Sequence, residues 1–384
     1  MPRSPRCILP LSSFRLSTTV PAATEYAEPM RSAGIVAICA LALTAIGCSR
    51  GAGAPPPATA APTATATPVP VPTIEPVTRV LFTGDIIPAR CTYAKVQALG
   101  GDWTQPFRPL HDVLSSADLT AGSLDSTISD AGTPYGCIET FSLAGPAAAA
   151  DGLAYAGFDV MAHAANHVKD CGVSPCGDEA LLQTAVNLRA RGIVTAGDGA
   201  DLAAARTPRV VERNGVRFAF LAYDDIAPYY HADATTAGAA AMDPATVGED
   251  IARARAMAEV VIVMPHWGIE YTSAPSERQR EFARACAAAG ATLVIGNHPH
   301  WVQAHEQIGD TFVAYALGNF VFDQDWSLET QQGAMLEVTF TGSRVTGTRY
   351  LPVHIFEQYQ PRLAAPDEAA SILGRIEEAS AGLR

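Results

Sequence analysis

From residue 79 onward, short runs of apolar and β-branched residues alternate with longer segments in which apolar residues recur at every third or fourth position. The short runs are continuously apolar, which is typical of strands buried on both faces. The longer segments carry arginine and acidic residues between their apolar positions, as amphipathic helices do. The pattern predicts strands over residues 79–84, 216–223, 259–265, 291–296 and 312–318, and helices over 178–192, 247–258 and 276–290.

The alternation of strands and helices predicts an α/β fold with at least one mixed sheet. Residues 333–356 have the pattern of a β-hairpin, so not every pair of strands is parallel. Gly192 and Gly290 stand where the C-caps of two predicted helices belong. No internal repeat or second domain boundary divides residues 79–384, which we expect to form one domain.

The segment before this domain is of a different kind. Residues 30–47 begin with Met30 and Arg31, continue as an apolar run and end in small residues before Cys48, which is typical of a secretory signal peptide. The ending Ala-Ile-Gly-Cys resembles the cleavage site of bacterial lipoproteins, where Cys48 carries the lipid; the alternative is a signal anchor that stays attached. We expect residues 1–29 to be untranslated or disordered, because they lack periodicity and precede a good start at Met30.

Residues 48–78 are rich in proline, alanine and threonine, a composition typical of an extended, semi-rigid tether. A tether behind a lipidated cysteine predicts an exported domain that its lipid anchor holds at the extracytoplasmic face of a membrane, at the cell surface. The formal net charge of −13 over 384 residues argues against non-specific binding to nucleic acid or to anionic lipid surfaces. An anionic substrate therefore needs local positive charge, from a metal or from a few arginines.

Side chains of the metal-ligand type recur just after the apolar runs. In open α/β sheets, sites form beyond the carboxyl ends of strands, so we expect these side chains to meet at one edge. Carboxylate, amide and imidazole groups together suit a divalent transition ion such as Mn, Fe or Zn. Two such ions about 4 Å apart would clamp a phosphate-like group and activate a water molecule. The residues concerned are Asp85, Asp125, Asn166, His167, His266, His298 and His300.

Some of these residues also have a purely structural interpretation. His266, taken alone, is a candidate hydrogen-bonded structural histidine beside Trp267, and Asp85 is a candidate turn cap. His298 and His300 are two residues apart, so in an extended segment both point the same way. The recurrence of ligand-type residues at successive strand ends favours the metal site over the structural interpretation.

Five motifs, in order along the chain, resemble those of a known family: FTGDIIPAR, ANHVKDCG, HWGIEY, GNHPHWVQ and ALGNFVFDQ. From about Val80 to Phe356 the chain resembles the CapA-type family of poly-γ-glutamate capsule biosynthesis proteins. The resemblance implies kinship with calcineurin-like metallophosphoesterases, and hence a four-layer αββα sandwich with mixed sheets and a dinuclear metal site. It implies that His167 assists the leaving group and that the metal ligands are Asp85, Asn166, His266, His298 and His300, with Asp125 at a position where the family has glutamate.

Two positions depart from the family pattern. The family's asparagine-leucine-glutamate is Ser123-Leu124-Asp125 here, which puts the carboxylate on a shorter stem. The phosphoesterases have a histidine two residues after the first aspartate, where this chain has Ile87. One of the two metal positions is therefore expected to lack a ligand.

Further residues of these motifs have looser assignments. Arg90 is a candidate catalytic donor to an anionic group, with a surface arginine as the alternative. Glu270 and Asp170 are candidates to orient the histidines from outside the ligand set, and Asp170 is a catalytic candidate as well. Asn319 and Asp323 are expected to shape a turn beside the site.

The cysteines fit an exported protein. Cys171 and Cys176 are close enough to form a disulfide in an oxidising compartment, and Cys91 and Cys137 are a second candidate pair. The alternative is a thiolate metal site, which is less favoured because nothing near Cys171 has the spacing of a zinc ribbon. Cys286 lies in a helix of small apolar residues and is expected to be a free, buried thiol.

Two functions are open at this point. The first is an extracytoplasmic, metal-dependent hydrolase or transferase that acts on a phosphate or amide substrate. The second is a non-catalytic surface lipoprotein that binds or anchors poly-γ-glutamate or another anionic polymer. The family resemblance also implies partners, namely membrane-embedded polymer synthetase subunits.

Overall fold

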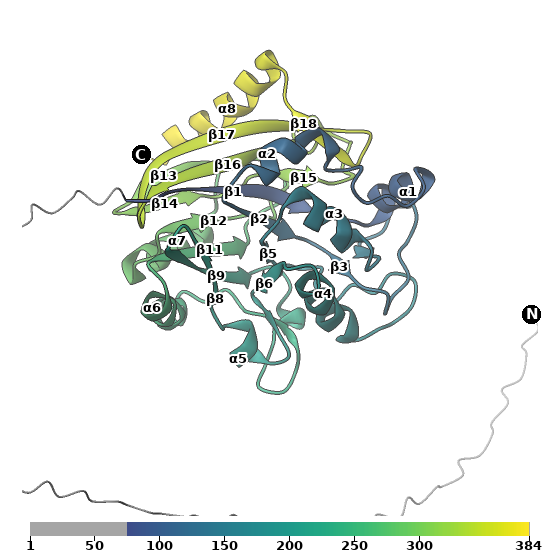
Figure 1. Cartoon of the computed structure of the whole chain (residues 1–384), viewed down its shortest axis with the longest axis horizontal. Coiled ribbons are helices and arrows are strands. Elements are labelled where there is room, and N and C mark those ends of the chain that lie inside the picture. The colour runs from purple at the N-terminus through teal and green to yellow at the C-terminus, as the bar shows by residue number, and fades with distance from the viewer. Residues whose placement is uncertain (1–74, 384) are drawn as a thin grey trace, which may run out of the picture. The chain divides into compact units, whose positions relative to one another are not determined.

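A computed structural model describes residues 75–383 of the chain. The predictions for residues 1–29, for the signal peptide at 30–47, for lipidated Cys48 and for most of the tether lie outside the described residues. Two large β-sheets lie face to face, and helices cover the outer face of each (Figure 1). None of the helices described between residues 75 and 383 combines the length and the hydrophobicity of a membrane span.

The first sheet has eight strands in the order β18-β17-β16-β1-β2-β5-β6, with β15 pairing with the end of β1. The central strands run parallel to one another, whereas β16, β17 and β18 form an antiparallel edge. The strand bounds are β1 Val77–Ile86, β2 Leu119–Leu124, β5 Val160–Ala162, β6 Val194–Ala196, β15 Asn319–Val321, β16 Gln332–Thr341, β17 Arg344–Phe356 and β18 Gln360–Leu363.

The second sheet has six strands in the order β13-β14-β12-β11-β9-β8. Its four inner strands are parallel, and its outer strands β8 and β13 are antiparallel to their neighbours. The bounds are β8 Arg209–Arg213, β9 Val216–Asp224, β11 Val260–His266, β12 Leu293–Ile295, β13 His305–Ile308 and β14 Thr311–Ala314. Two short pairs complete the β-structure: β3 Thr127–Ile128 with β4 Ala144–Gly145, and β7 Asp198–Gly199 with β10 Gly238–Ala239.

Three apolar layers separate the four layers of secondary structure. The middle layer joins the two sheets, for example where Phe218 of β9 meets Phe340 of β16 edge-to-face with ring centroids 5.3 Å apart. A second layer lies between the first sheet and α1 Arg90–Ala98, α2 His111–Ser115, α3 Ala149–Ala156 and α4 Glu179–Arg189. The third lies between the second sheet and α6 Val247–Met257 and α7 Glu277–Ala289.

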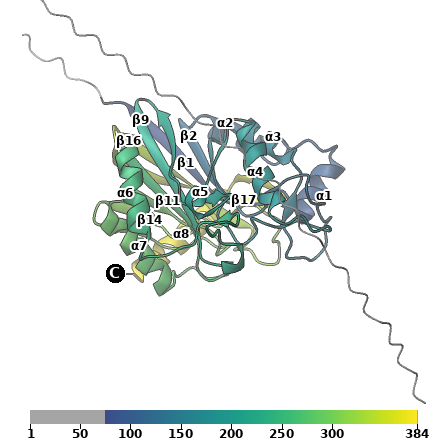
Figure 2. The same ribbon diagram turned by 90° about the horizontal axis from the view of Figure 1, so that it is seen from below.

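Figure 2 shows α6 and α7 on one side of the domain and α1 on the other. The short helix α5 Leu202–Ala205 follows β7, and the C-terminal helix α8 Pro366–Ala381 packs on β13, β16 and β17. The predicted four-layer αββα order with mixed sheets is thus confirmed.

Most predicted elements form within two or three residues of the expected bounds. The hairpin of residues 333–356 appears as β16 and β17, and Gly290 caps α7 with a φ of 89°. Gly192 also has a positive φ, but α4 ends at Arg189 and Ala190 is its C-cap. The prediction of one strand over 312–318 was wrong, because β14 ends at Ala314 and the chain then crosses to the first sheet.

Candidate metal centre

The carboxyl ends of parallel strands from both sheets meet at one place. From the first sheet come Asp85 at the end of β1, Asp125 just after β2, and Asn166, four residues after β5. From the second sheet come His266 at the end of β11 and the pair His298 and His300 after β12. Five of these six residues are buried, and Asn166 is half-buried.

Asp85 is held by the close approach of two chain segments. A Cβ on the preceding residue, Gly84, would lie 1.9 Å from the carbonyl oxygen of Gly318, so only glycine fits there. The N–H of Asp85 donates to that same oxygen at 2.9 Å. The Asp85 carboxylate accepts from the Ser123 hydroxyl at 2.8 Å and from the backbone N–H of His298 at 3.0 Å.

His266 lies at the centre of the group. Its Nε2 is 2.8 Å from the Asn166 Oδ1, 3.2 Å from the His298 Nδ1 and 3.4 Å from the Asp125 Oδ1. Its Nδ1 is 3.8 Å from the Asp85 Oδ1. One imidazole therefore touches side chains that arise from four other strand ends.

Burial sets the protonation of the three imidazoles. It holds the pKa values of His266 and His298 well below the usual range, and the neighbouring histidines add to the effect. Burial also lowers the pKa of His300 to about 3, although a hydrogen bond to Asn319 opposes the shift. The three rings are therefore neutral at physiological pH, which is the form that binds a metal.

The pKa values of the two buried carboxyl groups, Asp85 and Asp125, shift in the opposite direction, upward. Burial, and next the charge of Asp125, raises the pKa of Asp85 well above its usual range. Burial likewise raises the pKa of Asp125 to about 6, with Asp170 and Asp224 adding to the rise and His167 opposing it. The charge of Asp125 therefore opposes ionisation of Asp85, and a bound divalent cation would favour the charged form of both.

Unpartnered atoms show where such a cation fits. Among the described residues, neither carboxylate oxygen of Asp125 has a hydrogen-bond partner, and neither does the Nδ1 of His266. Buried polar atoms are normally satisfied, and an ion is one standard reason for an exception. Carboxylate, amide and neutral imidazole donors fit a divalent transition ion.

A second set of ligand atoms lies on the other side of His298. One ligand atom from each of Glu270, His298 and His300 lies within 4.8 Å of the others. His300 directs its Nδ1 to the Asn319 Oδ1 at 2.9 Å, and its Nε2 lies 3.9 Å from the Glu270 carboxylate. Asn319 thus orients the His300 imidazole, as a residue outside the ligand set does. Glu270, which is exposed, instead lies close enough to His298 and His300 to be a metal ligand itself.

The two histidines of the GNHPHWVQ motif differ from expectation in backbone conformation. We expected an extended segment, but His298 and His300 have φ values of 98° and 59°. This strained backbone turns the chain so that the His298 N–H and the His300 ring both approach the Asp85 carboxylate. Tyr271, whose ring stacks on His300 at a centroid distance of 6.0 Å, is in the left-handed region too.

His167 lies beside the ligand group and is paired with Asp170. The His167 Nδ1 is 2.6 Å from the Asp170 Oδ2, which also accepts from the backbone N–H of Leu143 at 2.6 Å. Burial alone would lower the pKa of His167, but the carboxylates of Asp125 and Asp170 outweigh it and raise the pKa. The arrangement favours the protonated form of this imidazole at the edge of the centre.

Arg90 is placed differently from our prediction. Its guanidinium donates to the Asp323 carboxylate through two nitrogen atoms and to the Thr140 carbonyl at 3.0 Å. Asp323 also accepts from the backbone N–H of Cys91 at 2.9 Å. Arg90 therefore forms an ion pair with Asp323 and connects two loops beside the site. Its guanidinium is not free to bind an anion through two nitrogen atoms.

Ile87 offers no ligand atom. Its side chain is fully buried in a small apolar cluster with Ala89, Leu143, Phe322 and Ile355. The departure from the phosphoesterase pattern is therefore a packing position in this chain.

Asp224 was missed by our sequence analysis. It ends β9, directly beside His266 in the register of the second sheet, and its carboxylate accepts from the Ala227 N–H and contacts the His231 Nε2, both at 2.9 Å. The strand over 216–223 was predicted, so the strand-end rule applied to Asp224 would have found it. The buried pair His163 and Asp198, 3.5 Å apart, was missed as well.

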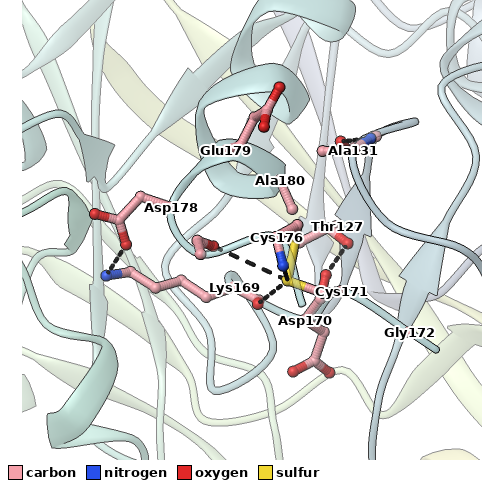
Figure 3. The surroundings of a disulfide bond; sticks show 12 residues. Thr127, Ala131, Lys169, Asp170, Cys171, Gly172, Cys176, Asp178, Glu179 and Ala180 are labelled. Carbon is pink, nitrogen blue, oxygen red and sulfur yellow. Dashed lines mark hydrogen bonds and ion pairs between the residues drawn. A yellow bond between two sulfur atoms is a disulfide. The ribbon is translucent and has the colours of Figure 1, made fainter. Parts of the chain in front are cut away.

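The cysteines pair as the sequence predicts. One disulfide joins Cys91 to Cys137. A second, shown in Figure 3, joins Cys171 to Cys176. Cys286 is a free thiol and is buried. Trp267 is fully buried, and its indole N–H donates to the Tyr315 carbonyl, so it packs the core beneath the site.

Comparison with known proteins gives one family and several relatives. Residues 79–324 match the bacterial capsule synthesis protein family, PGA_cap. The chain is 28% identical over 285 residues to the PGA biosynthesis protein CapA of Bacillus subtilis (strain 168), covering 74% of this chain and 73% of that protein. It is also 28% identical over 282 residues to the capsule biosynthesis protein CapA of Bacillus anthracis, with 71% and 66% covered.

Solved structures resemble the chain more distantly. A 5′-nucleotidase precursor from Thermus thermophilus aligns with a TM-score of 0.43 at 14% identity, over 80% of this chain and 59% of that one. The NAD nucleotidase of Haemophilus influenzae aligns with a TM-score of 0.42 at 14% identity, over 79% and 63%.

Proposed function

Because the chain belongs to the family of bacterial capsule synthesis proteins, we propose that it acts at the cell surface in the synthesis or export of a capsular polymer of the poly-γ-glutamate type, through a metal-dependent hydrolase site at its strand ends. The family match itself supports a role in capsule synthesis. The surface location, the metal and the hydrolytic reaction are the parts that we propose.

One observation carries the metal-dependent site. The Asp125 carboxylate is buried without a hydrogen-bond partner among the described residues, 3.4 Å from a neutral imidazole. An unpaired buried carboxylate is costly, and a ligated cation offsets that cost. We assign one ion to Asp85, Asp125, Asn166 and His266, and a second to His298, His300 and Glu270 beside the same Asp85 carboxylate.

When bound, a pair of divalent ions such as Mn, Fe or Zn would polarise a phosphate or an amide carbonyl and would lower the pKa of a water molecule, so that it acts as a nucleophile at neutral pH. The chain's own residues do the rest. His167, whose protonated form Asp125 and Asp170 favour, is placed to give a proton to the leaving group. Asn319 holds His300 in one tautomer through its Nδ1, which leaves the Nε2 facing Glu270.

The cellular setting that we propose combines several features. Cys48 would carry the lipid anchor and the proline-rich tether would hold the domain away from the membrane. The two disulfides beside the site suit an oxidising compartment outside the cytoplasm. The partners would be a polymer or a phosphate or amide substrate, together with membrane-embedded synthetase subunits.

A second function has one observation in its favour. The packed side chain of Ile87 removes a ligand that the phosphoesterases have, and the guanidinium of Arg90 is already paired. A non-catalytic lipoprotein that binds or anchors an anionic polymer would tolerate both features.

Substitution separates the two functions. With the purified protein loaded with Mn, Fe or Zn in turn, hydrolysis of phosphodiester and γ-glutamyl amide substrates should be detected and should fall by at least about 100-fold in His167→Ala. Binding of polymer without turnover of any substrate, and equally by His167→Ala, would favour the non-catalytic function.

A further inference from the structure

We propose that the two disulfides regulate the pair of His167 and Asp170 beside the candidate metal centre. They hold a loop, residues 129–143, which we call the strap, against the side chains that position His167. The catalytic pair of His167 and Asp170 is then correctly set only in the oxidised protein. This proposal rests on the proposed function and adds the condition under which the site works.

The strap reaches the catalytic pair directly. Leu143, at its end, donates its backbone N–H to the Asp170 Oδ2 at 2.6 Å, and the same oxygen contacts the His167 Nδ1. Thr127, just before the strap, donates its hydroxyl to the Asp170 carbonyl at 2.7 Å (Figure 3). Asp170, which holds His167, is therefore itself held twice: its carboxylate by the end of the strap and its backbone carbonyl by a residue just before the strap.

The Cys171–Cys176 loop follows Asp170 at once and is joined to the strap by three backbone donors. The Thr133 N–H donates to the Cys171 carbonyl at 3.0 Å, and the Val173 N–H donates back to the Thr133 carbonyl at 2.9 Å. The Gly172 N–H donates to the Ser142 hydroxyl at 3.0 Å.

Two glycines allow the strap and the Cys171–Cys176 loop to come into backbone contact. A Cβ on Gly132 would lie 2.0 Å from the Cys171 carbonyl oxygen, and one on Gly172 would lie 1.8 Å from the Thr133 oxygen. No side chain fits at either position, so the sequence is adapted to the contact.

The other disulfide fixes the middle of the strap to the beginning of α1. Cys137 lies in the strap and Cys91 follows Arg90, whose guanidinium donates to the Thr140 carbonyl at 3.0 Å. The Asp323 carboxylate binds both Arg90 and the Cys91 N–H. The strap is thus attached to the rim of the site at both cysteine pairs.

Ser129 and Leu143 at the two ends of the strap are buried and hydrogen-bonded, but few interactions hold its middle, residues 134–141, in place. The strap runs between β3 and β4 with no regular secondary structure longer than a single bridge, and its Ile138 and Phe141 side chains are 53% and 90% exposed. A segment with so little buried apolar surface has low local stability. The Cys91–Cys137 disulfide, which closes a separation of 46 residues, is therefore expected to order the middle of the strap, whereas the Cys171–Cys176 disulfide acts through the loop that the strap is hydrogen-bonded to.

The redox step follows ordinary thiol–disulfide exchange. In a reducing compartment the four cysteines are thiols and the strap is loose. An external disulfide oxidant then accepts two electrons for each bond formed; two thiol protons leave, one protein disulfide forms, and the oxidant becomes a dithiol. The catalytic pair is consequently assembled only after export.

Hydrogen exchange tests this coupling without relying on activity. Two double variants each remove one disulfide: Cys91→Ser with Cys137→Ser, and Cys171→Ser with Cys176→Ser. In each, we expect the backbone amides of Thr133, Leu143 and Val173 to exchange at least about 10-fold faster than in the unsubstituted protein. Reduction of the unsubstituted protein by dithiothreitol should have the same effect, and reoxidation by glutathione disulfide should reverse it. Cys286→Ala, which removes the free thiol, is the matched control and should exchange normally at these amides.

Activity and metal content supply the second readout. We expect kcat of the double-serine variants to fall about 100-fold with KM changed less than about two-fold, because the strap sets the position of His167 and holds none of the proposed ligands. The bound metal should be unchanged. Unchanged exchange and unchanged kcat would overturn the proposal, as would global unfolding on reduction, because the effect would then not be confined to the strap. Faster exchange in a protein whose oxidised form hydrolyses nothing would retain the strap and reject the proposed hydrolase function.

Discussion

The Nε2 of His266 lies 2.8 Å from the Oδ1 of Asn166, although 100 residues separate them and they follow strands of different sheets. This contact joins the carboxyl end of β11 to the loop after β5, across the interface of the two sheets. The candidate metal centre therefore forms only when the sheets pack together. Binding of metal to the folded chain should in turn stabilise that packing.

The support that Asn319 gives to His300 can be tested by substitution. Asn319→Ala removes the acceptor for the His300 Nδ1, so the ring loses its fixed orientation. We expect metal affinity to fall about 10- to 100-fold, as is typical for partners that orient a ligand. Competition with a fluorescent chelator measures this affinity, and Gln307→Ala, at an exposed position of β13, serves as the control. Equal affinity in the two variants would show that Asn319 has only a packing role.

The close approach at Gly84 predicts a loss of stability. In Gly84→Ala the new methyl group would lie 1.9 Å from the Gly318 carbonyl oxygen and would force β1 away from β15. We expect urea denaturation to show a loss of several kcal/mol in the free energy of unfolding, together with loss of metal. Gly374→Ala in α8, where no atom lies within 4 Å of the added Cβ, should instead stabilise the protein by about 0.5–1 kcal/mol. A similar small effect in both variants would contradict the account of how Asp85 is placed.

An exposed aromatic pair beside His300 predicts a contribution to substrate binding. The Trp326 side chain is 61% exposed and meets Tyr271 edge-to-face at 6.1 Å, and Tyr271 stacks on His300. Trp326→Ala should leave Tm nearly unchanged, since exposed substitutions cost within about 0.5 kcal/mol. If substrate packs on this ring, KM should rise about 2- to 10-fold, the range of an aromatic contact. Steady-state kinetics with the best substrate decide, and an unaltered KM would place the substrate elsewhere.

Cys286 gives a prediction for pH dependence. Burial raises the pKa of this thiol, so the native protein keeps it protonated where an unfolded chain, with a pKa near 9.0, begins to ionise. The thiol's contribution to stability is therefore complete below pH 9 and is lost as pH rises above it, by up to about 1.4 kcal/mol per pH unit. Denaturation of the protein and of Cys286→Ala at several pH values between 8 and 10 measures the difference in slope. Parallel slopes, or rapid alkylation of Cys286 by iodoacetamide in the native protein, would show that the thiol is accessible.

Much of the fold followed from local pattern. The continuous apolar runs that became β1, β9, β11 and β12 are buried on both faces, so their sequence directly reflects their environment. The strand after β12 was overextended in the prediction, because nothing in residues 312–318 marks the crossing between sheets except Gly318. The way in which the two sheets pack against each other depends on side chains from many parts of the chain, so no short segment of sequence predicts it.

The site was predictable to a similar degree. The rule that ligands follow strand ends found the six residues that now lie together, but it was not applied to Asp224. Arg90 and Asp323 are 233 residues apart, so the spacing of residues in the sequence could not reveal that the guanidinium is already bound to a carboxylate. The left-handed conformation of His298 and His300 likewise depends on tertiary contacts that override the extended preference around Pro299.

The central claim is that these strand-end side chains hold metal, and elemental analysis of the purified protein tests it most directly. The protein must be prepared without chelators or a metal-binding affinity tag. The double variant His298→Ala, His300→Ala is prepared and analysed in the same way. We predict close to two equivalents of Mn, Fe or Zn in the unsubstituted protein and at most one in the variant. A folded protein that contains no metal, and that binds none when Mn, Fe or Zn is supplied, would contradict the account.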